Sequence, residues 1–115
     1  MRDVRSEEDP AGPAVDLLGE LCRQLAELVL WDRAVGDDAP RFGLMLQERA
    51  ERVTTVAETL AREPVLAGDA ELDRRVAALR AAATRSRMAT RYSRDVVEAV
   101  HEVAERAEDV LGVTW

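Results

Sequence analysis

The sequence predicts an all-α protein, an antiparallel bundle of about four helices. Apolar residues recur in alternating steps of four and three along much of the chain, which is the spacing of one helix face. Glycine and proline stand near the ends of these segments, and residues 70–111 contain neither. Aromatic residues make up only 3% of the chain. The core must therefore consist of Leu, Val and Ala, which suits closely packed helices.

The predicted elements are a disordered, charged tail over residues 1–13 and helices over approximately 14–35, 40–63, 70–90 and 94–111. Residues 14–115 are expected to form one domain, a length that buries about two-thirds of the surface of the unfolded chain. All sixteen basic residues are Arg. This bias indicates a GC-rich genome, as in many bacteria, and carries no information about mechanism.

Helix boundaries follow from residues that favour helix ends. Gly36 is expected to end the first helix and Asp38 to cap the second. Pro64 should end the second helix, since a proline inside a helix removes a hydrogen bond. Asp69 is expected to cap the third helix and Gly112 to end the last.

Residues 70–111 could form one helix or two. Two apolar rows run through this segment, and they do not share a register. The mismatch predicts a break near residues 91–94, with Ser93 or Asp95 as the new cap and Glu98 completing a capping box after Asp95. A single bent helix is the alternative.

The first predicted helix has an unusually wide apolar face, which consists of Leu17, Leu18, Leu21, Cys22, Leu25, Leu28, Val29 and Val35. Such a helix is either central to the bundle, contacting the most neighbours, or covered by a second copy. Asp32 falls within this face. A buried Asp32 would need a partner such as an arginine, but fraying of the helix end, which exposes Asp32 to water, is the favoured interpretation.

The other helices have narrower rows with the four–three spacing of bundles and coiled coils. We expect these rows to face the core. Their members are Leu46, Ala50, Val53, Ala57 and Leu60 in the second helix, Leu72, Val76, Leu79, Ala83, Ser86 and Thr90 in the third, and Val96, Val100, Val103, Ala107 and Val110 in the fourth.

Charge is distributed unevenly. The chain has a net charge of −7, yet residues 74–94 contain seven arginines and no carboxylate. Arg80, Arg87, Arg91 and Arg94 are expected to form one exposed row. The acids of the last helix, including Glu98, should face away from the core and leave these arginines unmatched within the chain. The row is then solvated surface, a contact for a protein partner, or a nucleic-acid site.

Few residues suggest catalysis or metal binding. Cys22 lies on the apolar side of its helix, and the single histidine, His101, is far away in the sequence, so no nucleophile–base pair is expected. Glu98 and His101 have the Glu-x-x-His spacing of ferritin-like iron sites, but a second half-site would have to come from a dimer. We therefore expect no metal and no cofactor.

The sequence thus predicts a non-catalytic helical interaction or regulatory protein. Its partner would be another protein or a second copy of itself, most simply as a homodimer. The expected contacts are Arg80, Arg87, Arg91 and Arg94 with Leu30 and Trp31 as apolar anchors. A nucleic-acid-binding protein and a di-iron protein completed by dimerisation are the alternatives, the first disfavoured by the net negative charge. The absence of a signal-like or membrane-spanning stretch predicts a cytoplasmic location.

Overall fold

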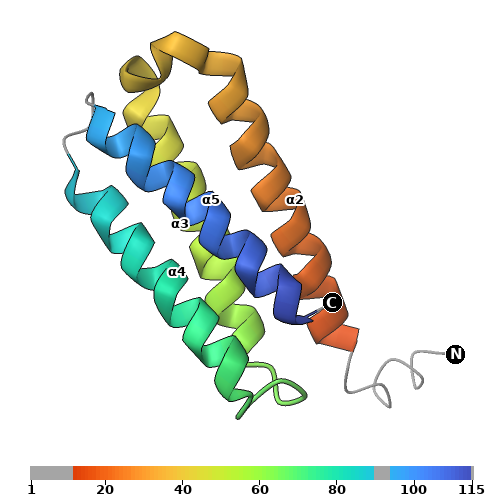
Figure 1. Cartoon of the computed structure of the whole chain (residues 1–115). Coiled ribbons are helices and arrows are strands. Elements are labelled where there is room, and N and C mark those ends of the chain that lie inside the picture. The colour runs from red at the N-terminus through yellow and green to blue at the C-terminus, as the bar shows by residue number, and fades with distance from the viewer. Residues whose placement is uncertain (1–11, 90–93, 115) are drawn as a thin grey trace, which may run out of the picture.

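The computed structural model describes residues 12–89 and 94–114, and within them it contains helices and no strand. The elements are α2 (Gly12–Val35), a 3-10 segment η1 (Gly36–Phe42), α3 (Gly43–Ala61), α4 (Ala70–Met88) and α5 (Arg94–Thr114). Each α-helix runs antiparallel to the next along the chain (Figure 1). The predicted all-α, four-helix bundle is confirmed.

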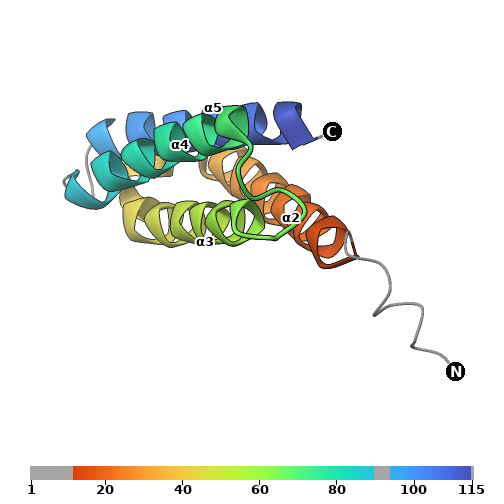
Figure 2. The same ribbon diagram turned by 90° about the horizontal axis from the view of Figure 1, so that it is seen from below.

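The helices form two layers, with α4 and α5 above α2 and α3 (Figure 2). The most extensive contact joins α4 to α5, and the next joins α2 to α3. Helices α3 and α5 touch all the other helices, whereas α2 meets α5 over a short stretch only. The expectation that the first helix contacts the most neighbours is therefore wrong, and α2 is a peripheral helix.

The predicted rows of α3, α4 and α5 face the core, and this expectation is confirmed for all their described members. Every apolar residue of these rows is at most 2% exposed. Ser86 is equally buried, while Thr90 lies outside the described residues. Small side chains such as Ala83 and Ala107 have no accessible surface, because the helices approach one another closely there.

Some helix ends follow the prediction. Asp69 caps α4, and its carboxylate accepts hydrogen bonds from the backbone N–H groups of Glu71 and Leu72 at 3.0 and 3.1 Å. Gly36 follows the end of α2 with a φ of 51°, which glycine adopts without the strain of a Cβ. Helix α3 ends at Ala61, shortly before Pro64.

Other boundaries differ from the prediction. Asp38 does not cap the second helix, because residues 36–42 continue as a 3-10 turn and Phe42 precedes α3 without a side-chain cap. Gly112 does not end the last helix, which extends to Thr114. Helix α2 begins at Gly12, so the predicted tail loses its last two residues to the helix, and the rest of it lies outside the described residues.

The predicted break between the third and fourth helices agrees with the structure, where α4 ends at Met88 and α5 begins at Arg94. Asp95 lies in the first turn of α5 and does not precede it, whereas Ser93 is outside the described residues. The α4 terminus is tied to α3 by Gln47, a buried side chain that donates a hydrogen bond of 2.5 Å to the carbonyl of Ser86. This carbonyl also accepts a weaker hydrogen bond, of 3.3 Å, from the backbone N–H of Ala89, so the Gln47 side chain reinforces the end of α4.

We expect Asp69→Ala to lower the free energy of unfolding by about 1 kcal/mol, because two backbone N–H groups of α4 lose their acceptor. Urea denaturation measures the change. Asp73→Ala is the matched control, since Asp73 lies in the same first turn, where a carboxylate gains a few tenths of a kcal/mol from the helix dipole. Equal losses in the two variants would contradict the capping role.

Candidate interaction surface

The arginines of α4 are not free. Arg80 forms an ion pair with Glu58 of α3 at 2.6 Å, and Arg87 forms one with Glu51 of the same helix. The expectation that this row is unmatched within the chain is therefore wrong. Both pairs cross from one helix to the next at the exposed edge of the α3–α4 contact, where long side chains bridge the gap.

An acidic residue of α5 also pairs with these arginines, although the acids of this helix were expected to face away from them. Glu102 accepts two hydrogen bonds from Arg85 of α4, the shorter of them 2.6 Å, and it lies 3.7 Å from Arg106. The sequence placed Glu102 on the outer face of α5. The structure places it on the flank beside α4, because α4 packs closely on α5 and the arginine side chain spans the remaining distance.

The remaining members of the predicted arginine row are Arg91 and Arg94. Arg94 is the first residue of α5, is exposed, and pairs with no carboxylate among the residues that the structure describes. Arg91 lies outside the described residues. The structure therefore does not bring the four predicted arginines together as one open cationic surface.

His101 and Asp32 join α5 to α2. The Nε2 atom of His101 lies 2.5 Å from Oδ2 of Asp32, whose side chain is only 19% exposed. The favoured interpretation, a frayed helix end, is wrong, because α2 continues to Val35. The alternative, a largely buried Asp32 with a partner, agrees with the structure, but the partner is a histidine and not the expected arginine. The contact is an ion pair only while the imidazole is protonated.

No further metal-ligating side chains gather around Glu98 and His101 among the described residues. Both residues are exposed, and His101 is already engaged by Asp32. Across the described ranges, no group of three or more His, Cys, Asp or Glu side chains is arranged to hold a metal ion. Within the same ranges, no helix is both long enough and apolar enough to traverse a bilayer.

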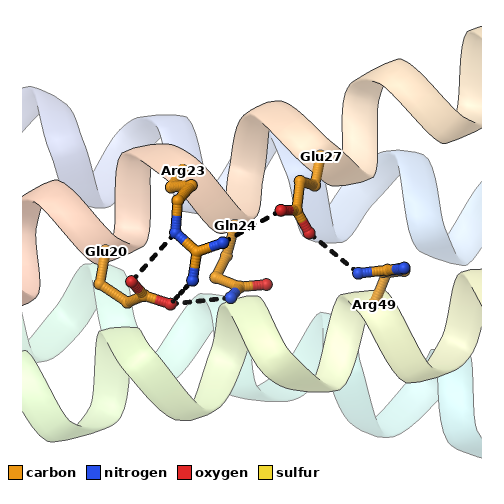
Figure 3. Close-up of polar contacts among 5 residues, drawn as sticks. All are labelled: Glu20, Arg23, Gln24, Glu27 and Arg49. Atoms are coloured by element: carbon orange, nitrogen blue, oxygen red, sulfur yellow. Dashed lines mark hydrogen bonds and ion pairs between the residues drawn. The ribbon is translucent and has the colours of Figure 1, made fainter.

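A polar network lies along the side of α2 that faces α3 (Figure 3). Arg23 bridges Glu20 and Glu27 within α2, and Glu27 continues to Arg49 of α3 at 2.9 Å. Hydrogen bonds from Gln24 and then from Arg23 lower the pKa of Glu20. The stabilisation from ionised Glu20 is thus present above its ordinary pKa and is lost as the pH falls through the lowered value. Of these contacts, the Glu27–Arg49 pair is the one that links α2 to α3, and the others lie within α2.

The opposite side of α2 is apolar and open. A groove between α2 and α5 is lined by Cys22, Leu25, Ala26, Val29, Leu30, Arg33, Glu108 and Leu111. Leu30 is 67% exposed at its edge, and the neighbouring Trp31 is 39% exposed. The two apolar anchors expected from the sequence thus lie on the surface, and Leu30 borders the groove.

The sequence prediction overlooked a second apolar row on the first helix. Val15, Gly19, Cys22, Ala26, Val29 and Arg33 follow one another in steps of four and three, the same spacing as the core rows. Leu21 and Leu28 face the core and are fully buried, so this second row lies on another side of the helix. The repeat was visible in the sequence, but only Cys22 and Val29 of its members were included in the expected wide face. We call this second row the outer row.

A second groove lies between α4 and α5, where it is lined by Arg85, Met88, Ala89, Asp95, Glu98, Ala99 and Glu102. Charged residues are the majority of this lining, and Met88, 82% exposed, is its largest apolar side chain. Searches of protein-family models, curated proteins and solved structures find no match to the chain. The candidate surface must therefore be judged from this structure.

The Arg80–Glu58 pair allows a test of the corrected charge arrangement. In a double-mutant cycle with Arg80→Ala and Glu58→Ala, we expect a coupling free energy below about 1 kcal/mol that shrinks with added salt, because Arg80 is about half exposed. Urea denaturation of the four proteins supplies the values. Arg80→Ala combined with Glu51→Ala is the control and should show no coupling, since Glu51 pairs with Arg87. Zero coupling between Arg80 and Glu58 at low salt would contradict the observed pair.

Proposed function

We propose that the protein is a non-catalytic helical interaction module with a regulatory role, binding a protein partner or a second copy of itself through the outer row of α2. The observation that carries the proposal is the open apolar groove beside Leu30. Isolated exposed leucines are common on soluble proteins. A leucine beside an apolar groove and a continuous apolar row is instead typical of an interaction site.

The energetics favour an apolar contact over the arginine row. Burying a leucine side chain that is now exposed contributes about 1.5–3 kcal/mol to association. A partner that used Arg80 or Arg87 would first have to displace Glu58 or Glu51, so the net gain would be small. Of the contacts expected from the sequence, Leu30 is retained as an anchor. Trp31 does not line the groove and points to another side of α2, and the arginines take a secondary role at most.

The alternative functions gain no specific support. A nucleic-acid phosphate would compete with carboxylates that already hold Arg80, Arg85 and Arg87. A di-iron site would need the ligand cluster that the described residues do not form. A cytoplasmic location remains part of the proposal, because the single Cys22 can form no disulfide within the chain.

The test is affinity capture with two matched variants. Leu30→Glu places a charge on the proposed surface and should reduce capture of any bound protein, including a differently tagged copy, at least tenfold. Met88→Glu makes the same kind of change at a more exposed apolar side chain far from the outer row and should leave capture unchanged. Equal capture by the wild type and both variants would contradict the proposed function.

A further inference from the structure

We infer that the outer row of α2 binds a second copy of this chain, with the two α2 helices antiparallel. This inference rests on the proposed function and specifies its partner. The wide apolar face of the first helix left two possibilities, a central helix or a helix covered by another copy. Its own chain covers the outer row only in part: Cys22 and Val29 are half-buried, whereas the other four members are exposed.

The outer row has the geometry for helix pairing. From Val15 to Arg33 it extends about 27 Å along α2 at 1.5 Å per residue. Its four–three spacing suits a shallow crossing of two helices. Val15 is exposed at one end of the row, and Leu30 is exposed beside the row towards its other end, so apolar side chains are available near both ends.

The shape of this side of α2 fits a second α2 helix that runs in the opposite direction. An antiparallel pair centred near Leu25 places Leu30 of one copy at the level of Gly19 of the other. Leu30 is two-thirds exposed and projects from the surface, whereas a Cβ built on Gly19 would meet no atom within 4 Å. Glycine inside a helix is destabilising, and nothing in its own chain requires it there. In the proposed dimer, Leu30 of the second copy would lie over the exposed backbone of Gly19, where no side chain stands in the way.

The charges on α2 also favour an antiparallel pair, because residues of opposite charge lie near its two ends. Asp16 lies near the start of α2 and Arg33 near its end, and both are exposed without an ion-pair partner in the described part of the chain. In the same antiparallel register, Asp16 of each copy lies at the same height along the helix axis as Arg33 of the other copy. The pair therefore contains this combination of charges two times. A parallel pair would instead set like charges against each other, which disfavours it.

The contact is small, so the dimer should be weak. One helix face and part of a groove bury less than the roughly 800 Å² per partner of a standard stable interface. We therefore expect a monomer–dimer equilibrium that depends on concentration. A second α2 that runs in the opposite direction supplies the required order of charges and side chains automatically, whereas an unrelated protein would not. This match favours a second copy as the partner.

The experiment is sedimentation velocity of the full chain over a wide concentration range. The wild type should pass from monomer to dimer as the concentration rises. Arg33→Glu and Asp16→Arg should each weaken the dimer roughly tenfold, because two attractive contacts become repulsive. The double variant should recover wild-type association, since the pairs are restored with exchanged signs. Arg52→Glu, the same charge change at an exposed position of α3, is the control and should have no effect.

The outcomes separate this inference from the proposed function. A chain that stays monomeric at all concentrations, or a double variant as weak as the single ones, overturns the inference. If capture of a foreign protein still depends on Leu30, the proposed function stands without it. If neither self-association nor capture depends on Leu30, both are overturned.

Discussion

The close packing of α4 on α5 is the constraint on which the rest of the structure depends. Small side chains at the contact, such as Ala83 and Ala107, have no accessible surface, so the two helices approach closely and form one layer. Helix α3 completes a three-helix core against this layer with its own narrow row. Helix α2 packs mainly on α3 and meets α5 over a short stretch, so its contact with the α4–α5 layer is limited.

Because its contacts are limited in this way, one side of α2 stays open. Its apolar residues are divided between two sides: Leu21 and Leu28 are buried in the core, whereas Leu30 and most of the outer row are exposed. The buried leucines fix how α2 is rotated, and the Glu27–Arg49 ion pair adds one polar link to α3 (Figure 3). Apolar surface left exposed on a helix with a fixed orientation is the physical basis of the proposed function.

Much of the fold could be predicted from the sequence, because burial and helix capping are encoded locally. The rows of α3, α4 and α5 and the Asp69 cap illustrate this. The site could be predicted only in part. Leu30 and Trp31 are exposed as expected, and their role as anchors stays a prediction. The pairing of Arg80 with Glu58 was missed, since periodicity defines the faces of a helix and not its neighbours. The peripheral place of α2 was missed for the same reason.

The rate at which a maleimide labels Cys22 tests the central claim most directly, because this thiol lies in the outer row and is the only one in the chain. The account predicts that the labelling rate falls as the protein concentration rises, since association covers the row. A cysteine placed at exposed Ala81 in a Cys22→Ala background should be labelled at one rate throughout. A Cys22 labelling rate that is equally independent of concentration would contradict the account.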